Sequence, residues 1–319
     1  MQRRTALGLL GSALGVLAMP AAAQDNQLVR IVVPYAPGGQ TDSMARLLAD
    51  SMRKKLGRTV IVENRPGAAA LIATKYVQAA PPDGDTLLFH NAGLVSLPML
   101  NKAATYDPIA DFDAVAMVGF SPSFVMVTDS VPARTLPEFL AYAKANPGIE
   151  CANSGINSGG HIAAMLLEKL ADIRLTHIPY KGSAEVTRAL LSGEVKMQVS
   201  VTTDSLNPYI QNGKIRMLGV ASQTRSRLTP HVPPIAESLP GFVFDGWFGF
   251  LTSAKTPPGK REAMATVIQE ALQEPLIKER FAELFMDINP RGPKAFAEII
   301  AASKTFFEGV VQQLQLART

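Results

Sequence analysis

Short apolar runs alternate with stretches of helical periodicity along most of the chain. In the first part, each β-branched run ends in a loop rich in Gly, Pro or Asn, and a helical pattern follows; these runs occupy residues 31–33, 59–62 and 86–89. A second series of the same kind contains the runs 150–152, 174–179, 195–201 and 215–221. Alternation of strands and helices at this spacing predicts parallel strands joined by crossover helices, which is the α/β class.

The remaining pattern indicates how the two series are joined. Residues 114–119, 124–128 and 242–251 are apolar runs typical of strands, and the tail is helical, with starts near Pro257 and Pro293. A helical tail that follows a complete second series needs a sheet to pack against, so we expect it to return to the first. We therefore predict two lobes with crossing strands at the hinge: lobe 1 from residues 25–119 plus 224–319, and lobe 2 from residues 120–223.

The first strand leads into Pro34-Tyr-Ala-Pro-Gly-Gly-Gln-Thr-Asp42. The prolines end the strand, and Gly38 and Gly39 let backbone amides approach a ligand without a Cβ between them. Thr41 and Asp42 are good caps for the helix that follows. A glycine pair at a helix N-terminus predicts an anion-binding loop, and a tight turn without a ligand is the alternative.

The loop Asn153-Ser-Gly-Ile-Asn-Ser-Gly-Gly-His161 is the counterpart in the second series. Ser154, Asn157 and Ser158 could donate hydrogen bonds to a carboxylate alongside backbone amides. The alternative is a helix cap followed by a flexible loop. Two such helix N-termini from separate lobes would converge on one cleft, and this favours ligand binding. For His161, we expect a neutral imidazole that packs against or caps the loop.

Other side chains at strand ends are further candidates for ligand contact. Tyr35 and Tyr180 could flank the body of a ligand. Lys181 is either solvated or near the ligand, and both interpretations remain open. Asp204 follows another strand, where a helix cap is favoured over ligand contact. Trp247, in the aromatic strand, is expected in the core.

The N-terminus has the pattern of a secretory signal. Arg3 and Arg4 precede the apolar run 6–18, and small residues lead to a cleavage site after Ala23. Residues 1–23 are therefore predicted to be removed, and both the general and the twin-arginine export routes stay open. Removal lowers the formal charge from +4 to +2, which does not indicate nucleic-acid binding. A single cysteine excludes an intramolecular disulfide framework, so an exported protein of this kind depends on its core.

Motifs for catalysis or cofactor binding are missing from the sequence. It contains no G-x-S-x-G, no phosphate-binding P-loop and no G-x-G-x-x-G motif, and its four histidines lack metal-ligand spacing. Cys151 is the one candidate nucleophile, but no partner base is evident and a buried structural thiol is favoured. Asp42 and Asp204 would be an acid/base pair only if the fold brought them together. We therefore predict no enzyme, no metal and no cofactor.

Motifs along the whole mature chain resemble those of the Bug-type periplasmic solute-binding receptors of tripartite tricarboxylate transporters. The segment 34–42 resembles the family's opening signature, and further similar segments follow in the same order: Val62-Glu-Asn-Arg-Pro-Gly-Ala68, Asp83-Gly-Asp-Thr-Leu-Leu88, residues 154–161, Thr176-His-Ile-Pro-Tyr-Lys-Gly-Ser183, residues 212–221 and Gly246-Trp-Phe-Gly249. The resemblance implies a type II-like two-lobed binding fold, with a mixed sheet flanked by helices in each lobe and no enzymatic activity. It also implies a small carboxylate held at helix N-termini, partly through ordered waters.

Two departures from the family pattern lie in the expected ligand loops. Ala69 and Ala70 stand where glycines are usual, and Asn157 stands where glycine is usual. Gly159 and Gly160 replace small polar or proline residues. Because these loops line the expected pocket, the departures bear on which acid is bound.

We expect a monomeric periplasmic receptor that captures an organic acid and delivers it to the permease subunits of a tripartite tricarboxylate-type transporter. A diacid is favoured, and aliphatic and aromatic acids both stay open. The alternatives are a periplasmic enzyme acting on a carboxylate and a ligand-sensing adaptor for a membrane sensor. The candidate ligand-binding residues are Tyr35, Gly38, Gly39, Gln40, Thr41, Asp42, Ala68, Asn91, Ser154, Asn157, Ser158, Tyr180 and Asp204.

Overall fold

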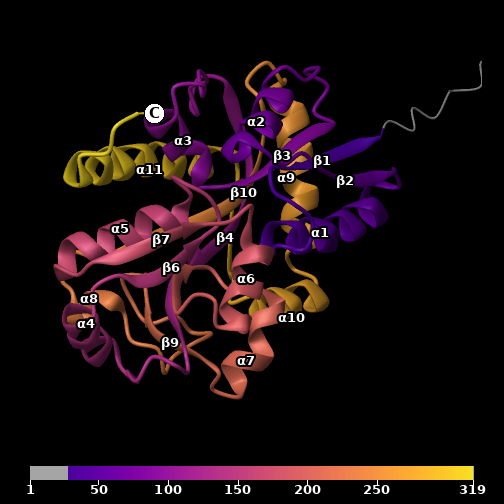
Figure 1. Cartoon of the computed structure of the whole chain (residues 1–319). Helices are drawn as coiled ribbons and strands as arrows, with labels where there is room; N and C mark the ends of the chain where they lie inside the picture. The colour runs from indigo at the N-terminus through magenta and orange to yellow at the C-terminus, as the bar shows by residue number, and fades with distance from the viewer. Residues whose placement is uncertain (1–27, 319) are drawn as a thin grey trace, which may run out of the picture.

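The computed structural model describes residues 28–318, so the predicted signal peptide lies outside the described residues. The protein has two lobes, each built around its own sheet (Figure 1). The predicted two-lobed α/β fold is therefore confirmed. The first sheet has the order β11-β4-β10-β3-β1-β2. Its strands are β1 (Val29–Val33), β2 (Val60–Asn64), β3 (Thr86–Asn91), β4 (Phe112–Pro122), β10 (Asp245–Ser253) and β11 (Asp287–Arg291).

The second sheet has the order β7-β6-β8-β5-β9. Its strands are β5 (Phe124–Thr128), β6 (Ile149–Asn153), β7 (Leu175–Pro179), β8 (Met197–Ser200) and β9 (Ile215–Val220). Both sheets are mixed. In the first, β1 pairs in parallel with β2 and β3, whereas β10 runs antiparallel to β3 and β4. In the second, β6 is parallel to β7 and β8, whereas β5 is antiparallel to β8 and β9.

Helices cover the faces of both sheets, as crossover connections require. Around the first sheet lie α1 (Gln40–Leu56), α2 (Leu71–Gln78), α3 (Gly93–Leu100), α9 (Pro258–Ala271), α10 (Pro275–Glu283) and α11 (Pro293–Leu314). Around the second lie α4 (Leu136–Ala145), α5 (Gly159–Ala171), α6 (Ser183–Ser192), α7 (Asn207–Gln211) and α8 (Ile235–Ser238). Short 3₁₀ turns, η1 (Ala68–Ala70) and η2 (Asp204–Leu206), precede α2 and α7.

The long strand β4 connects the two lobes. It pairs with β10 from Phe112 opposite Ser253 to Pro122 opposite Asp245, and only Ser123 separates it from β5 in the second sheet. The chain returns to the first sheet through β10. The tail then packs on the first lobe, with α9 against β4 and α1, and α11 against β4 and α3. The same α11 also contacts α5 of the second lobe.

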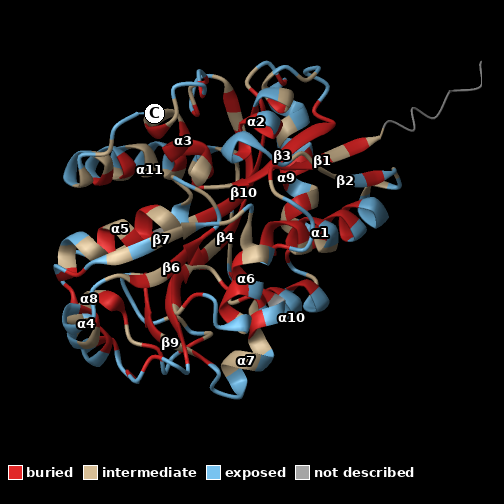
Figure 2. Ribbon diagram, viewed as in Figure 1, coloured by how far each residue is buried: buried red, intermediate tan, exposed pale blue. Residues whose placement is uncertain are grey.

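Buried side chains follow both sheets and the inner faces of the helices (Figure 2). The indole of Trp247 is 1% exposed and meets the Phe296 ring edge-on at 5.0 Å. Its Nε1–H donates to Ser303 Oγ at 2.9 Å, which satisfies the polar atom of a buried aromatic. The predicted core position of Trp247 is therefore confirmed.

Two parts of the predicted element list are wrong. The helical pattern expected to follow the loop that ends at Ala68 starts only at Leu71, because residues 68–70 form a left-handed turn. The tail was expected to be helical, but it also contains the strand β11. Asn289 and Pro290 are turn formers and hide the strand pattern; only pairing with the edge of β4 makes this segment extended. Among residues 28–318, no helix has the length and apolar character needed to cross a membrane.

The packing of Phe296 on β10 generates a stability prediction. A Cβ on Gly249 would lie 2.4 Å from the Phe296 ring and 2.9 Å from the Ala116 carbonyl oxygen, whereas one on Gly246, in the same strand, would lie no closer than 3.7 Å to Ser121 O. We expect Gly249→Ala to lower the free energy of unfolding by about 1–3 kcal/mol through overpacking, and Gly246→Ala to change it by less than about 0.5 kcal/mol. Urea denaturation of both variants checks this, and equal effects would contradict the packing described.

Candidate functional site

Loops at the carboxyl ends of strands from both sheets meet between the lobes. Gly39 is the N-cap residue of α1, and Ser183 begins α6 of the other lobe. A Cβ on Gly39 would lie 2.8 Å from Ser183 Oγ, so the two helix N-termini are in direct contact across the cleft. Each N-terminus carries unsatisfied N–H groups and a partial positive charge, so this junction favours an anion.

Asp42 braces the first ligand loop. Its carboxylate accepts hydrogen bonds from the Gly38 amide at 3.0 Å and from the Asn64 side-chain amide at 2.9 Å. It also pairs with Arg46, at 3.0 Å from Nε and 2.9 Å from Nη2. Burial opposes ionisation, yet the hydrogen bonds from Arg46, Gly38 and Asn64 hold the pKa of the Asp42 carboxyl below its usual value. Asp42 therefore fixes the shape of the loop by accepting a hydrogen bond from the backbone amide of Gly38 within it.

Tyr35 and Asn91 form a second brace beneath the loop. The Tyr35 hydroxyl donates to Asn91 Oδ1 at 3.1 Å, and the same oxygen accepts the Gly93 amide at 2.9 Å. The Tyr35 ring also meets His90 edge-on at 5.9 Å. Burial raises the pKa of Tyr35 to about 12 and lowers that of His90 to about 4, so both groups are neutral at pH 7.

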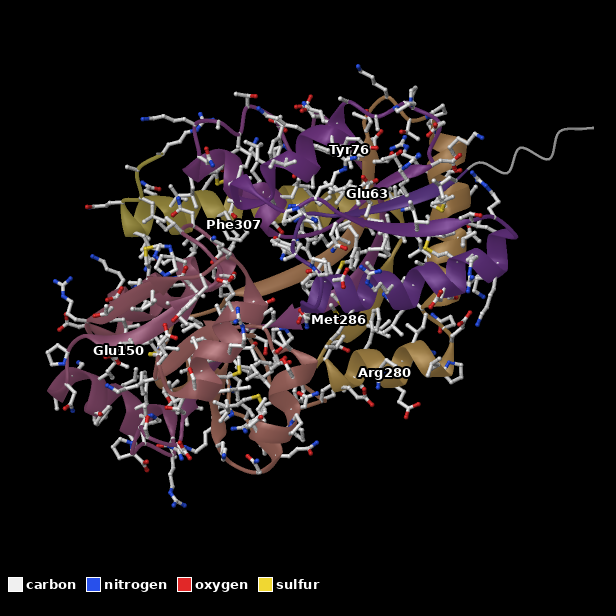
Figure 3. The ribbon with its side chains drawn as sticks, turned by 45° about the vertical axis from the view of Figure 1, so that its right-hand side comes forward. Glu63, Tyr76, Glu150, Arg280, Met286 and Phe307 are labelled. Atoms are coloured by element: carbon white, nitrogen blue, oxygen red, sulfur yellow. The ribbon has the colours of Figure 1, made fainter. Side chains whose placement is uncertain are left out.

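Gln40 links the first loop to the hinge and to the tail. Its side chain is 4% exposed, and Nε2 donates to Ser121 Oγ at 2.9 Å and to the Leu284 carbonyl oxygen at 3.0 Å. Thr202 Oγ1, from the second lobe, donates to the same carbonyl oxygen at 3.5 Å. The turn between α10 and β11 thus contacts ligand-side loops of both lobes, and Met286, in the same turn, lies where the lobes meet (Figure 3).

The candidate residue Ala68 opens a left-handed turn. Ala68, Ala69 and Ala70 have φ values of 47°, 53° and 80°, which L-residues rarely adopt. Asn157, in the loop of the second lobe, has φ 62°. Three positions where this chain departs from the glycines usual in the resembling family, Ala69, Ala70 and Asn157, therefore need a backbone conformation that glycine adopts without strain.

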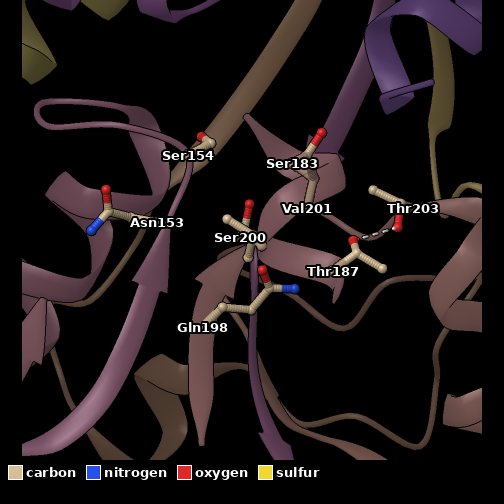
Figure 4. Close-up of a pocket in the computed structure, with 9 residues that line it drawn as sticks. Asn153, Ser154, Ser183, Thr187, Gln198, Ser200, Val201 and Thr203 are labelled. Carbon is tan, nitrogen blue, oxygen red and sulfur yellow. Dashed lines mark hydrogen bonds between the residues drawn. The ribbon is translucent and has the colours of Figure 1, made fainter. Parts of the chain in front are cut away.

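A small polar cavity lies on the second-lobe side of the cleft (Figure 4). Its volume of about 10 Å³ has room for roughly one water molecule. Neutral hydroxyl and amide groups dominate the lining, which consists of Asn153, Ser154, Ser183, Val186, Thr187, Gln198, Ser200, Val201 and Thr203. Of these, Asn153 and Ser154 lie in a loop predicted to bind ligand, and Ser154 is a candidate residue. Gln198 was not among the predicted site residues, although a single amide side chain within an apolar strand could have indicated it.

The loop 153–158 is held by its own polar groups. Asn153 Oδ1 accepts the Gly155 amide at 3.1 Å, and the Ser158 amide donates to Gly155 O at 3.1 Å. Ser158 is the N-cap of α5 and accepts the His161 amide at 3.4 Å. The helix cap, named above as the alternative to ligand binding, is present at this N-terminus, and the exposed Ser154 side chain lines the cavity.

The other candidates lie further from this junction or make other contacts. The Tyr180 hydroxyl donates to Glu194 Oε1 at 2.6 Å, although its backbone amide binds Asn153 O at 2.9 Å. Lys181 is exposed, and its backbone amide donates to Glu185 Oε2 at 3.0 Å. Thr41 is buried within the first turn of α1, and Asp204 begins η2.

Cations near the first loop are already paired. Arg46 binds Asp42, and Arg65 binds Glu63 at 2.5 Å while its guanidinium lies 3.6 Å from the centre of the Tyr76 ring. Figure 3 shows Glu63 and Tyr76 together on the first lobe. Backbone amides, hydroxyls and side-chain amides are therefore the groups available to an anion at the junction of α1 and α6.

Nucleophilic and metal chemistry find little support among residues 28–318. Cys151 is fully buried, and burial together with the nearby Glu168 charge raises its pKa to about 12, so it is a thiol at neutral pH. No group of three or more His, Cys, Asp or Glu side chains in this part of the chain is arranged to hold a metal ion.

Comparison with known proteins gives consistent matches. The profile of the tripartite tricarboxylate transporter family receptor matches residues 44–316. A UPF0065 protein from the gbd 5' region of Cupriavidus necator is 33% identical over 100% of this chain and 99% of its own length. Protein BugT of Bordetella pertussis is 32% identical over 80% of this chain and 79% of its own.

Solved structures agree in fold. The periplasmic binding protein BugD is 30% identical, with a TM-score of 0.84 over 92% of this chain and 99% of its own. Rpa4515 of R. palustris, solved with adipate, is 28% identical with a TM-score of 0.85, covering 91% of this chain and 98% of that one. MatC of Rhodopseudomonas palustris, with bound malate, is 28% identical with a TM-score of 0.81, covering 89% and 98%.

The left-handed turn generates the prediction for this site. Each L-residue in this conformation costs about 1–2 kcal/mol, and glycine avoids that cost while losing about 0.4–1 kcal/mol through the flexibility of the unfolded chain. We expect Ala69→Gly to raise the free energy of unfolding by about 0.5–1 kcal/mol. The control is Ala302→Gly at an exposed position inside α11, which should lower it by up to about 1 kcal/mol. Chemical denaturation gives both values, and a loss of stability in Ala69→Gly would contradict the strained turn.

Proposed function

The chain belongs to the tripartite tricarboxylate transporter receptor family, and from this membership we propose that it captures a small organic acid between its two lobes and delivers it to the membrane subunits of such a transporter. The observation that carries the proposal is the contact between the N-terminus of α1 at Gly39 and the N-terminus of α6 at Ser183. Two positive helix ends from separate lobes face one small region, and that arrangement suits an anion held by both lobes.

The chemistry of the junction supports a carboxylate ligand. Its polar groups are backbone amides, hydroxyls and the Gln198 side-chain amide, whose Nε2 also lies 3.7 Å from Met126 Sδ, and each kind of group can donate a hydrogen bond to a carboxylate oxygen. Of the candidate residues, Gly39 lies against Ser183 and Ser154 lines the cavity together with Ser183. We propose that the ligand site also includes Gly38, Gln40, Thr41, Ala68, Asn157 and Ser158. Asp42, Tyr35 and Asn91 support the loops from behind through the hydrogen bonds described above.

A diacid is the favoured ligand. Rpa4515 was solved with adipate and MatC with malate, and both molecules carry two carboxylates. In this chain, one carboxylate would bind the loop 38–41 through the amides of residues 39–41, since the Gly38 amide already donates to Asp42, and the other carboxylate would bind the polar groups of residues 154–158. Because Arg46 and Arg65 are already paired, neutral donors would stabilise the negative charge of the ligand. Each hydrogen bond would contribute about 1 kcal/mol to the binding free energy.

The proposed transport role also implies a periplasmic location and no enzymatic activity. Family relatives are periplasmic solute-binding receptors, and BugD is described as a periplasmic binding protein. We propose the same location for this chain, with export by residues 1–23, and a monomer that docks on permease subunits. We also propose that it has no enzymatic activity, in line with a Cys151 that stays protonated. No observation favours a sensory adaptor over a transport receptor.

Ligand binding would shift an equilibrium between open and closed lobes, because only the closed form contacts the acid from both sides. We propose lobe 1 as residues 25–119 plus 224–319 and lobe 2 as residues 120–223, with one change to the second boundary. One detail of the packing favours a later second crossing. The Val220 amide donates to Pro233 O at 2.9 Å and α8 packs on α4, so residues 224–239 lie with the second lobe.

A thermal-shift screen tests the ligand class. Adipate, malate, aromatic diacids and acidic amino acids would be compared with analogues in which one carboxylate is an ester or amide. A ligand at 100 times its Kd stabilises the folded state by about 2.7 kcal/mol, so we expect a clear rise in melting temperature for at least one diacid and a much smaller rise for its masked analogue. Equal shifts for diacid and masked analogue would refute the two-carboxylate model. Product formation from any of these acids would favour an enzyme instead.

Substitution of Gly39 tests closure. Gly39→Val would place methyl groups against Ser183 Oγ across the cleft, so we expect the Kd for a diacid found in the screen to rise at least about tenfold with little change in unfolding free energy. Gly292→Val is the matched control, because Gly292 is also an extended N-cap residue, with φ −72° against −88° at Gly39, and lies on α11. Ser183→Ala should recover part of the affinity in the double variant. Unchanged affinity in Gly39→Val would argue against closure at this contact.

A further inference from the structure

We propose that His161 is a positioning residue for the ligand loop 153–158, and that it acts by accepting a hydrogen bond from the Asn157 backbone amide. This inference rests on the proposed function, because it assigns a role within the same carboxylate site. It concerns the second lobe, where the loop carries Ser154 beside the polar cavity.

The hydrogen bond defines the chemical state of the ring. The Asn157 amide lies 3.1 Å from His161 Nδ1, and a backbone N–H always donates. Nδ1 must therefore carry its lone pair, and the proton of the neutral imidazole resides on Nε2. A protonated Nδ1 would face the amide with a second N–H, and the bond would be lost.

This bond restrains the most strained part of the loop. Asn157 has φ 62°, and the preceding Ile156 is 65% exposed at the tip, so packing does little to hold the segment. The other hydrogen bonds of the loop involve Asn153, Gly155 and Ser158. The bond to His161 connects the Asn157 backbone to the body of α5, and we infer that it keeps the left-handed residue in place.

Burial keeps His161 neutral, and the neighbouring His177 adds to this effect. The His161 and His177 rings meet edge-on at 4.9 Å, and His177 Nε2 lies 2.6 Å from Glu168 Oε2. Glu168 Oε1 accepts the Leu175 amide at 2.7 Å, so this carboxylate is fixed between α5 and β7. Burial first, and the His177 charge second, lower the pKa of His161 to about 4, while Glu168 opposes the shift. At neutral pH the acceptor on Nδ1 is therefore maintained.

The test compares two substitutions that differ in the acceptor. His161→Asn retains an oxygen near the position of Nδ1, whereas His161→Leu has similar bulk and no acceptor. His231→Leu, at an exposed histidine of the connection, is the matched control. In ligand-free protein, NMR should show the Asn157 amide exchanging at least about tenfold faster in His161→Leu than in wild type, with His161→Asn within about threefold. The Kd for adipate or malate should rise about tenfold in His161→Leu and recover in His161→Asn.

The two readouts separate this proposal from the proposed function. Unchanged Asn157 exchange in His161→Leu overturns the positioning role, whether or not a diacid binds. Faster exchange with unchanged affinity for a bound diacid also overturns it, because the loop would then be irrelevant to the ligand. If no acid binds the wild-type protein, the proposed function fails, and the exchange data still report on the hydrogen bond alone.

Two measurements remain decisive if His161→Leu does not fold. The ring nitrogen chemical shifts of wild-type His161 at neutral pH should identify Nδ1 as unprotonated, and a protonated Nδ1 would overturn the proposal. A depressed histidine pKa also makes the folded state lose stability as the pH falls from 6.5 towards 4. The free energy of unfolding of wild type, relative to His161→Asn, should therefore decrease across that window, and a constant difference would argue against the neutral His161 that the bond requires.

Discussion

The pairing of β4 with β10 is the contact on which the rest of the molecule depends. These strands lie at the centre of the first sheet, and each is also the chain's path to or from the second lobe. Small residues let other elements pack closely on this pair, because Phe296 of α11 lies directly over Gly249 and the backbone of β11 lies against Gly119. Both connections to the second lobe leave the same end of this pair, at Pro122 and Asp245, so the proposed closure would turn the lobes about a paired base.

In the proposed ligand site, neutral groups would bind a negatively charged ligand. Arg46 and Arg65 lie beside the first loop, but their partners Asp42 and Glu63 neutralise them, and they serve to shape the backbone. In the proposed site, an anion would be stabilised by helix ends and neutral donors, each of modest strength. Such a site gains affinity only when many donors are aligned at once, which explains why so many side chains, including Asn64, Asn91 and Asn153, hydrogen-bond to loop backbone. The proposed site would therefore gain its affinity from donors held in place before binding, and not from one strong ion pair.

Periodicity and turn residues were sufficient to predict the two-lobed α/β fold and both glycine-bearing loops, because these features depend on local sequence. Three features were not predictable from the local sequence. The strand β11 is extended only because β4 offers an edge to pair with. The left-handed turn at Ala68–Ala70 contradicts the helix propensity of alanine. Gln198 enters the cavity lining only once β8 is packed beneath α6.

The turn between α10 and β11 shows how the missed segment bears on the cleft. The Leu284 carbonyl oxygen accepts from Gln40 and from Thr202, and the Asn207 side chain donates to Glu283 O at 2.7 Å. Phe285, with φ 53°, turns its ring onto Phe124 at 5.8 Å, at the point where the chain enters the second sheet. One turn of the tail thus fixes the N-terminus of α1 relative to a loop of the other lobe. Because main-chain oxygens accept these bonds, side-chain substitution at positions 283 and 284 leaves the acceptors in place, and the geometry depends on the path of the backbone.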